Sequence, residues 1–461
     1  LSRGLGDVYK RQSALFAEPL AAPAADPAGG RRLDIAVVGA GIAGLAAAWM
    51  LAQRHRVTLY ERLPALGFTA ASVAVHGQRA DVPLRVFYPG YYPTLTRLYA
   101  ALGVASEPVS YATTFSGADG EPYFRWRNLR LGGRSWPLVA PHDLFGARAR
   151  RIAFGALVLQ RRLRAAAAAG TLAGTSIGEF VAAERIDRDC TEGLLWLALA
   201  TIATCTTADA RAVPAVVVAG YWGAGLARDS VRRAVNGADE VAARLVAPLA
   251  RVVCEAGVER VEAHAGGVRL HRRGGVEERF DHVVLATHAR QALQLWPGAP
   301  ADEAALLQRF ATRTLSVLMH RDATLMPRRR HHWSPVHAHV DPAAERPEST
   351  IWLNAVQPGL RQAPPLFQTV QPQREPRAGT LLAEARFERP LVSLDSEQAL
   401  AALRQIWGRG ATPGAAQRRV WLVGSYAETG VPLLESAVRS ALGVARALSV
   451  PVPWAAALNS A

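Results

Sequence analysis

The chain has 461 residues, half of them hydrophobic and a fifth charged, a balance that excludes wholesale disorder and indicates a globular protein of two or three domains. Its formal net charge is +15, and of the 53 lysine and arginine residues Lys10 alone is lysine. Mechanisms that need a lysine, such as Schiff-base chemistry, therefore depend on Lys10 or are excluded. The segment around Lys10 resembles translated adapter sequence, and we expect residues 1–32 to be a disordered or artefactual leader.

The cysteines and the apolar segments bear on the compartment. Cys190, Cys205 and Cys254 are widely spaced and form no CxxC pair. This pattern predicts neither a disulfide framework nor a zinc site, and it suits a reducing compartment. The longest uncharged apolar stretch, 212–227, is too short to span a membrane and is broken by proline and glycine. We expect a cytoplasmic protein. Its basic charge leaves peripheral contact with an acidic membrane surface as an open alternative.

The first ordered segment has the pattern of strand, glycine-rich loop, helix and strand. Residues 33–38 form a short apolar run typical of a buried parallel strand. The loop Gly-Ala-Gly-Ile-Ala-Gly at 39–44 follows, and apolar residues then recur at helical spacing from Leu45. A second strand over 57–60 ends at Glu61. This order is the context that a dinucleotide-binding fingerprint requires.

Each glycine of the loop has a physical role in that fingerprint. Gly39 permits the tight turn out of the strand, and Gly41 lets the backbone approach a pyrophosphate at the helix N-terminus. Gly44 allows the helix to pack closely on the strand. Glu61, which lies 22 residues after Gly39, is placed to bind ribose hydroxyls. The sequence therefore predicts a dinucleotide site at this turn.

The fingerprint alone does not choose between NAD and FAD. Arg62 could meet a 2′-phosphate, although an exposed charge is the simpler interpretation. Residues 251–289 have the pattern of strand edges, a hairpin and a buried strand that opens into a loop. Residues 420–448 have the pattern of a strand, a loop and an apolar-periodic helix. These two later segments would complete the nucleotide-binding fold that begins at the first strand. A cofactor domain built from separate stretches of the chain favours FAD.

Several runs carry a resemblance to a known family. They are 39–44 with Glu61, 81–87 followed by 91–95 and 102–104, 283–288 with 291–293, 325–330, and 424–430 with Pro432 and 435–437. Over roughly residues 33–450 the chain resembles the flavin-dependent amine oxidase and phytoene desaturase superfamily, nearest to its bacterial FAD-dependent oxidoreductases. The first run is generic to the superfamily, whereas 81–104 and 325–330 are more specific.

The resemblance implies an α/β fold in which a Rossmann-like FAD-binding domain of the glutathione-reductase type is interleaved with an α+β substrate domain. The FAD domain would take 33–104, 236–294 and 416–450, and the substrate domain 105–235 and 295–415, with a tail at 451–461. The backbone at Val258 would meet the adenine. The fingerprint and the resemblance together assign to the cofactor Gly39, Gly41, Ile42, Ala43, Gly44, Glu61, Arg62, Gly67, Phe68, Arg85, Val258, Thr287, Gly424, Ser425, Pro432, Glu435 and Ser436.

Two positions depart from the family pattern. Where the family has a Gly-Gly pair after the ribose acid, this chain has Gly67 and Phe68, so a phenyl group stands where backbone should approach phosphate. Where many members carry an acid after the C-terminal glycine, this chain has Ser425, which can donate a hydrogen bond but holds no charge. Both departures predict weaker FAD binding.

In this class the flavin carries the redox chemistry, so no catalytic residue is assigned. Candidates near the flavin face are Arg85, Tyr88, Tyr92 and Tyr426. Arg85 could stabilise negative charge on a reduced flavin, and pairing with a neighbouring carboxylate is an equal alternative. Residues 91–93 could line a substrate tunnel, although aromatic residues before a helix are more often core.

His288 ends a strand that would meet the cofactor, where a backbone role for Thr287 is favoured over catalysis by His288. The histidines at 331, 332, 337 and 339 have no acid or cysteine at ligand spacing, so no metal site is predicted. The arginines, including the run 328–330, are spread without a nucleic-acid module, so no nucleic-acid partner is predicted. Residues 194–199 and 212–227 are apolar enough for buried core or for a cavity that takes an acyl or isoprenoid group.

The sequence thus predicts an FAD-dependent oxidoreductase that removes hydride from a small apolar or lipid-like substrate, as desaturases do, with an unassigned electron acceptor. The lysine that holds a water against the flavin in many amine oxidases has no counterpart in the matching region. Two alternatives stay open. One is a non-catalytic flavin-fold binding protein, for which Phe68 and Ser425 are the motive. The other is an amine oxidase that works without the lysine.

Overall fold

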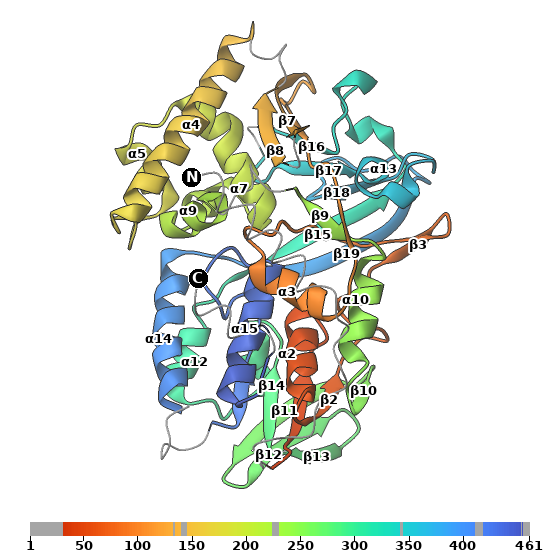
Figure 1. Cartoon of the computed structure of the whole chain (residues 1–461), viewed down its shortest axis with the longest axis vertical. Coiled ribbons are helices and arrows are strands. Elements are labelled where there is room, and N and C mark those ends of the chain that lie inside the picture. The colour runs from red at the N-terminus through yellow and green to blue at the C-terminus, as the bar shows by residue number, and fades with distance from the viewer. Residues whose placement is uncertain are drawn as a thin grey trace.

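A computed structural model describes residues 31–131, 134–139, 145–223, 230–341, 344–410, 418–452 and 454. Two units are stacked along the long axis of the molecule (Figure 1). The lower unit is built on a five-stranded sheet, and the upper unit on an eight-stranded sheet. The expected leader at 1–32 lies almost wholly outside the described residues, as does most of the expected tail at 451–461.

The lower sheet is parallel throughout and has the strand order β10-β2-β1-β14-β20. Its strands are β1 (Asp34–Val38), β2 (Arg56–Tyr60), β10 (Arg251–Val253), β14 (His282–Leu285) and β20 (Val420–Leu422). Three distant stretches of the chain therefore supply one sheet, and the strands expected in 33–60, 251–289 and 420–448 are confirmed. The α/β class with a Rossmann-like unit is confirmed as well.

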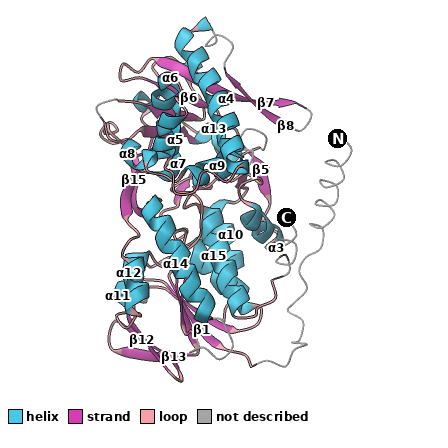
Figure 2. Cartoon of the chain, turned by 90° about the vertical axis from the view of Figure 1, so that its left-hand side faces the viewer, coloured by secondary structure: helices cyan, strands magenta, loops and turns pink. Residues whose placement is uncertain are grey.

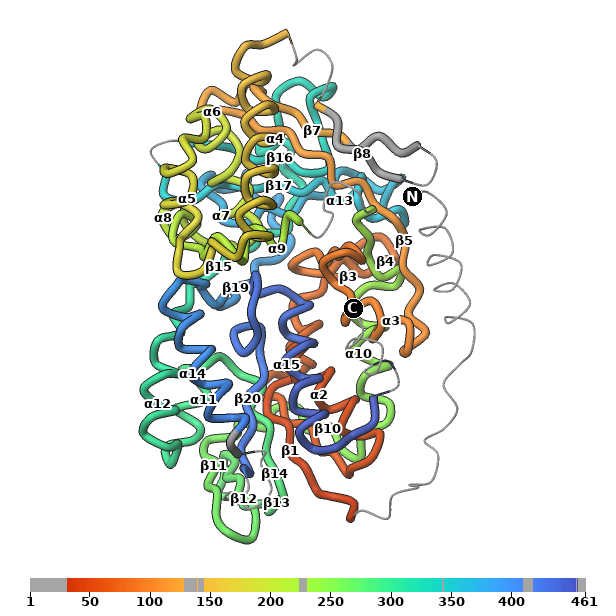
Figure 3. Tube along the Cα trace, turned by 60° about the vertical axis from the view of Figure 1, so that its left-hand side comes forward, coloured from red at the N-terminus to blue at the C-terminus, as the bar shows by residue number. Residues whose placement is uncertain are grey.

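Both faces of this sheet are buried, because side chains alternate along each strand. In β1, Ile35 and Val37 belong to one hydrophobic cluster, and Ala36 and Val38 belong to another. The first face is covered by α2 (Ile42–Ala52), α10 (Gly237–Val246) and α15 (Leu434–Ala447). Figure 3 shows α2, in red, beside α15, in dark blue, so the two ends of the described chain pack together.

The second face is covered by a three-stranded antiparallel sheet and by helices. These elements are β11 (Val258–His264), β12 (Gly267–Arg272), β13 (Val276–Phe280), α11 (Ala289–Leu295), α12 (Ala301–Leu307) and α14 (Leu394–Gly410). Leu307 and Leu403 join Val283 and Leu422 in one hydrophobic cluster. The assignment of all of 295–415 to the substrate domain is therefore wrong for α12 and α14. Their apolar periodicity indicates a buried face but does not say which sheet that face covers.

The upper unit has the strand order β19-β15-β18-β17-β16-β6-β7-β8. Its strands are β6 (Thr113–Ser116), β7 (Pro122–Leu131), β8 (Arg134–Val139), β15 (Thr312–His320), β16 (Val336–His339), β17 (Glu348–Trp352), β18 (Phe367–Val370) and β19 (Leu381–Pro390). Neighbouring strands are antiparallel except β6 and β16, which run parallel. A largely antiparallel sheet with helices set to one side is typical of an α+β unit.

Helices gather beside the mixed sheet, as Figure 2 shows. They are α4 (Ala147–Ala168), α5 (Ile177–Ala183), α6 (Arg188–Cys190), α7 (Trp196–Ala203), α8 (Thr207–Arg211) and α9 (Ala215–Gly223), with α13 (Leu353–Val356) after β17. Residues 194–199 are mostly buried core. Residues 224–227 of the apolar stretch lie outside the described part of the chain. Within that part, no helix combines the length and apolar character needed to cross a bilayer.

The two units are joined where the chain crosses between them. The short strands β5 (Ser106–Pro108) and β9 (Arg232–Ala234) pair with each other at one crossing. At the other, β15 and β19 pair from Thr312 opposite Pro390 onward. Helix α3 (Pro93–Ala101) lies at this junction, and the hairpin of β3 (Val73–Val75) and β4 (Gln78–Ala80) lies nearby (Figure 1). The junction is where a parallel sheet presents its carboxyl edge, the usual place for a ligand.

Candidate cofactor and substrate site

Three loops meet at the carboxyl edge of the parallel sheet. They follow β1, β14 and β20, the three adjacent strands at its centre and edge. The Ala286 amide donates to the Val38 carbonyl at 2.8 Å, and the Val423 amide donates to the Leu285 carbonyl at 3.1 Å. Backbone hydrogen bonding therefore continues past the strands and fixes the three loops side by side.

The glycines of the first loop do different work. A Cβ on Gly39, whose φ is +106°, would lie 2.7 Å from the Ala286 carbonyl oxygen. A Cβ on Gly44 would lie 1.9 Å from the Gly39 carbonyl oxygen. These two glycines are required by close packing. A Cβ on Gly41 would meet nothing within 4 Å, so Gly41 faces open space directly in front of α2.

The N-terminus of α2 is suited to an anion. Gly41 is its N-cap, no side chain accepts from its first amides, and its first turn holds no acidic residue. The amides of Ile42 and Ala43 lie in this first turn, where backbone N–H groups have no partner within the helix. An uncapped helix N-terminus that faces open space provides donors and a positive dipole end for a phosphate.

Glu61 lies at the end of β2 beside this loop. Its Oε2 accepts from the Ala40 amide at 2.9 Å, and its Oε1 accepts from the Leu63 amide at 3.0 Å. The side chain is buried, and each oxygen keeps a lone pair for a further donor such as a ribose hydroxyl. Arg62 is exposed. The Ala256 amide donates to the backbone carbonyl of Glu61 at 2.8 Å, which ties the segment that enters β11 at Val258 to the end of β2.

Residues 67 and 68 cross in front of the glycine loop. A Cβ on Gly67 would lie 2.9 Å from Glu61 Oε2, so the glycine leaves room for the acid. The Phe68 amide donates to the Ala40 carbonyl at 2.9 Å. The Phe68 ring is buried in the hydrophobic core, with the Arg85 guanidinium 4.2 Å from its centroid. The phenyl group therefore packs beneath an arginine rather than into the space at Gly41, which weakens the motive for a non-catalytic protein.

Arg85 is a half-buried cation whose hydrogen-bond partners are neutral. It donates through Nη1 to the Pro83 carbonyl at 3.2 Å and through Nη2 to the Phe68 carbonyl. Among the described residues, no carboxylate forms an ion pair with it, so the alternative of a carboxylate partner is wrong. Burial lowers the pKa of Arg85, and the nearby charge of Asp81 opposes this. A half-buried cation without a carboxylate partner favours an anionic ligand at this position.

The start of α15 is tied to α3. Glu435, which is buried, accepts from the Thr94 amide at 3.0 Å and the Leu95 amide at 2.9 Å, and so caps α3. Burial raises the pKa of Glu435. Ser436 Oγ donates to the Val431 carbonyl at 2.7 Å. The side chains of Glu435 and Ser436 thus hold the junction together, while the uncapped N-terminus of α15 faces the same region.

Four tyrosines form a cluster between α3 and α9. The ring centroids of Tyr88, Tyr91, Tyr92 and Tyr221 lie 4.7 to 6.1 Å from one another in the contacting pairs. The Tyr88 hydroxyl donates to the Tyr221 carbonyl at 3.0 Å, and the Tyr91 hydroxyl accepts from the Val431 amide at 2.9 Å. Burial raises the pKa of Tyr91 to about 12 and raises the pKa of the other three as well. The phenols are neutral near neutral pH and cannot serve as bases.

Tyr426 is not part of this cluster. Its ring packs on Phe310 at 5.2 Å, in the hydrophobic cluster beneath α12 and α14. The grouping of Tyr426 with Arg85, Tyr88 and Tyr92 is wrong, because the turn after Gly424 directs the ring into the core. A Cβ on Gly424 would lie 2.7 Å from that ring. Ser425 lies half-buried in the same turn.

The sequence analysis missed Arg389. This half-buried residue on β19 donates through Nη2 to the Pro432 carbonyl at 2.8 Å and through Nε to Thr204 Oγ1 at 3.1 Å. It forms no ion pair with a carboxylate in the described part of the chain, and burial lowers its pKa. The signal lay in the strand alternation, since Arg389 shares the inner face of β19 with Ala385 and Phe387.

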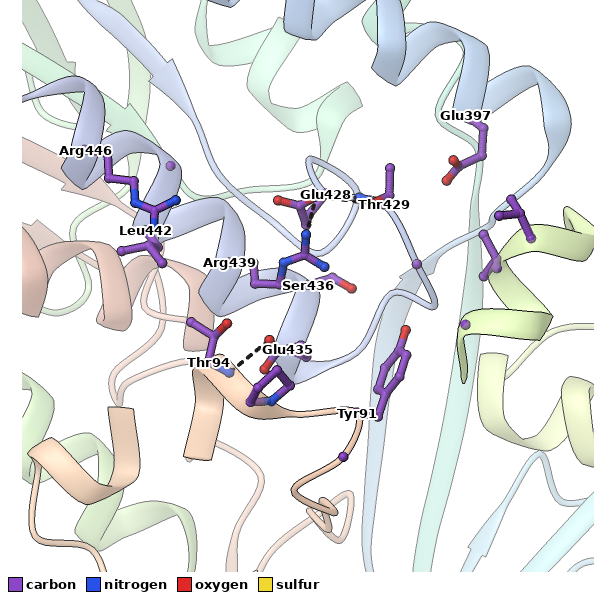
Figure 4. Close-up of a pocket in the computed structure, with 17 residues that line it drawn as sticks. Tyr91, Thr94, Glu397, Glu428, Thr429, Glu435, Ser436, Arg439, Leu442 and Arg446 are labelled. Atoms are coloured by element: carbon purple, nitrogen blue, oxygen red, sulfur yellow. Dashed lines mark hydrogen bonds and ion pairs between the residues drawn. The ribbon is translucent and has the colours of Figure 1, made fainter. Parts of the chain in front are cut away.

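A cavity of about 670 Å³ opens beside Tyr91 (Figure 4). It lies between α3, α9, α14 and α15 and the loop before α15. Its lining combines apolar and charged residues, and Leu442 lies beside Arg446 in Figure 4. The apolar ones are Pro93, Val216, Val217 and Leu442, and the charged ones are Glu397, Glu428, Glu435, Arg439 and Arg446. Glu428 pairs with Arg404 and with Arg439, the latter at 3.4 Å. The fingerprint glycines do not line this cavity, so it is separate from the dinucleotide space.

The remaining candidates from the sequence, Thr287 and the histidines, lie among residues of the fold. Thr287 and His288 lie half-buried between β14 and α11, and burial lowers the pKa of His288. The buried ring of His337 lies 3.2 Å from the Leu325 carbonyl oxygen and 3.1 Å from Ser116 Oγ. No group of three or more histidine, cysteine or acidic residues with metal-binding geometry occurs among the described residues. Arg328, Arg329 and Arg330 are exposed.

Comparisons with known proteins agree with this architecture. A family model described as an NAD(P)-binding Rossmann-like domain matches residues 37–102. No curated protein matches the chain. Among solved structures, a CLA-producing fatty acid isomerase from P. acnes superposes with a TM-score of 0.62 at 16% identity, covering 89% of this chain and 98% of that one.

Two further structures superpose over similar lengths. A putrescine oxidase redesigned in its cofactor binding has a TM-score of 0.63 at 14% identity, covering 91% of this chain and 99% of that one. An oxidoreductase from Methanosarcina mazei has a TM-score of 0.59 at 14% identity, covering 90% and 100%. The chain therefore shares one fold with these proteins over nearly its whole length. The fold that the resemblance implied is therefore confirmed.

Proposed function

We propose that the chain is an FAD-dependent oxidoreductase that removes hydride from an apolar, lipid-like substrate. The observation that carries the proposal is the uncapped N-terminus of α2, with open space at Gly41 and the Glu61 carboxylate beside it. These groups fit the pyrophosphate and ribose of a dinucleotide. The amides of Ile42 and Ala43 would hold the phosphates, and Glu61 the ribose.

Bound FAD would supply the oxidant, since flavins accept hydride from carbon. The chain's own contribution is charge and exclusion of water. Arg85 would place a positive charge where negative charge develops on reduction, without a competing carboxylate partner. The buried tyrosine cluster would keep the reacting end of the substrate dry, because its phenols stay neutral and its rings pack edge to face.

A second cation without a carboxylate partner among the described residues, Arg389, supports this substrate class. Arg389 approaches Tyr92 and the loop before α15, with neutral hydrogen-bond partners. A carboxylate at one end of a long apolar substrate would supply the missing anion. The cavity beside Tyr91, with its apolar wall from α9, offers an approach for the chain of such a molecule. The fold is shared with a protein that isomerises fatty acids, which supports the same class.

The proposal is tested by anaerobic mixing of the FAD-loaded protein with a panel of substrates. Unsaturated and saturated fatty acids should bleach the flavin absorption, and amines should not. A control with the methyl esters of the same acids should react weakly. Bleaching by amines, with release of hydrogen peroxide in air, would instead support an amine oxidase without the lysine. Bleaching by none of the compounds would overturn hydride removal from a lipid.

A further inference from the structure

Helix α4, at the outer edge of the upper unit, has an unusual composition. Its 22 residues include no aspartate or glutamate. They include six arginines, at positions 148, 150, 151, 161, 162 and 164. The helix belongs to the upper unit, away from the parallel sheet, and its inner side packs on α9 (Figure 1).

One face of α4 is fixed to the protein. Ile152, Leu159 and Leu163 are buried, and a Cβ on Gly155 would lie 2.5 Å from the Cβ of Cys190 on α6. The arginines beside this face are neutralised locally. Arg151 and Arg148 pair with Asp189, and Arg162 pairs with Glu184 at 2.7 Å. This side of the helix needs no further partner.

The opposite face carries a stripe of five residues. Arg150, Phe154, Leu157, Arg161 and Arg164 follow one another at spacings of four, three, four and three, so they lie on one side of the helix. The stripe extends about 21 Å at the ordinary rise per residue. Phe154 is 70% exposed and Leu157 is 66% exposed. Phe145, just before the helix, is 85% exposed.

Two arginines of the stripe are available to a ligand. Arg161 and Arg164 are exposed and form no ion pair within the described part of the chain. Large apolar side chains are thus exposed to solvent between arginines, on a helix that carries no acidic residue.

We propose that this face of α4 docks the protein on a membrane surface that contains anionic lipids. Phe145, Phe154 and Leu157 would enter the boundary of the acyl chains, and the flanking arginines would pair with lipid phosphates. A helix with arginines around an exposed aromatic and leucine patch, and too polar to span, is suited to lie in the interface. The partner is defined by charge complementarity, because anionic headgroups attract polybasic segments.

A second copy of the chain fits this face poorly. Two stripes brought together would oppose arginine to arginine, and each chain carries a formal charge of +15. The apolar part of the stripe consists of two side chains, Phe154 and Leu157. Its area is small beside the roughly 800 Å² per partner that a stable interface buries. The docking face does not depend on a flavin or on the proposed reaction, so the two proposals can fail separately.

The test is co-sedimentation of the full chain with vesicles of phosphatidylcholine alone and with phosphatidylglycerol added. We expect binding to the anionic vesicles that weakens as salt is raised, and little binding to the neutral ones. Phe154→Ser with Leu157→Ser should weaken binding at least about ten-fold, because each side chain loses its apolar insertion. Arg161→Gln with Arg164→Gln should weaken it about twenty-five-fold, at roughly five-fold per arginine.

Matched controls remove equal groups elsewhere. Leu381→Ser with Leu382→Ser removes two exposed leucines from β19, and Arg56→Gln with Arg273→Gln removes two exposed arginines. Both control pairs should bind as the parent chain does, and all variants should unfold at the parent's temperature. The proposal is overturned if the parent ignores anionic vesicles or if the controls lose binding equally. It is also overturned if the parent is a dimer that Phe154→Ser with Leu157→Ser makes monomeric.

Discussion

The guanidinium of Arg85 lies 4.2 Å from the centroid of the Phe68 ring and donates to the Phe68 carbonyl. The Phe68 amide in turn donates to the Ala40 carbonyl in the glycine loop. Arg85 is therefore connected through Phe68 to the predicted phosphate site. The arginine has neutral partners, which leaves its charge available to a bound anion.

Replacing Arg85 tests that availability. Arg85→Met should lower the two-electron reduction potential of bound FAD by about 30 to 60 mV, the equivalent of a charge-assisted hydrogen bond of about 1.5 to 3 kcal/mol. Arg85→Lys should retain most of the potential because it keeps the charge. The measurement is equilibration with a reference dye. Equal potentials in Arg85→Met and the parent would place the guanidinium away from the flavin.

The glycine loop gives a matched pair of variants. Gly41→Val adds atoms to open space, so the free energy of unfolding should change by less than about 0.5 kcal/mol. The added side chain would occupy the phosphate position and should weaken FAD binding at least ten-fold, about 1.4 kcal/mol. Gly44→Ala forces a Cβ against the Gly39 carbonyl and should destabilise the fold by about 3 kcal/mol.

These two effects are measured by urea unfolding of the cofactor-free protein and by titration with FAD. The account requires that the two variants separate stability from binding. If Gly41→Val bound FAD as tightly as the parent, the space in front of α2 would not be the phosphate site.

Arg389 is tested with an acid and its ester. Arg389→Gln should raise the KM for a fatty acid about ten- to hundred-fold, since a charge-assisted hydrogen bond contributes about 1.5 to 3 kcal/mol. The methyl ester should be unaffected. Arg386→Gln, on the exposed face of the same strand, is the control. Equal losses for acid and ester would mean that Arg389 acts through the fold, by its contacts with Pro432 and Thr204.

Glu435 gives stability a dependence on pH. Burial raises its pKa above the ordinary glutamate value of 4.5, although the amides of Thr94 and Leu95 oppose the shift. The folded chain therefore holds a proton that the unfolded chain has lost. The contribution to stability is present below pH 4.5 and declines as the pH rises through the folded pKa.

Glu435→Gln removes this titration. The free energy of unfolding of the parent should fall relative to that of the variant as the pH rises from 4.5 toward neutrality. Urea unfolding at a series of pH values measures the difference. A difference that stays constant with pH would show that the carboxyl group titrates alike in both states.

Local sequence patterns predicted those elements that depend on residues close together in the chain. The strand, the glycine loop, α2 and Glu61 lie within one continuous segment, and their spacing alone indicates the turn and its ligand. The helix at 434–448 was predictable for the same reason, because its apolar spacing is visible in one window. Each of these features rests on contacts between residues that are close in sequence.

What the sequence could not predict depends on distant contacts. Glu435 caps α3 across 341 residues, and nothing near Glu435 indicates that partner. Tyr426 turns toward Phe310 because α12 and α14 cover the second face of the parallel sheet. Arg389 had a local signal in the alternation of β19, but its partner at Pro432 comes from another part of the chain.

The central claim is that the protein binds FAD at the glycine loop. The most direct measurement is mass spectrometry of small molecules released from the pure protein, combined with titration of the stripped protein with FAD. The account predicts one FAD per chain, lost in Gly41→Val and retained in Arg389→Gln. A pure protein that releases no flavin, and takes up none when FAD is added, would contradict it.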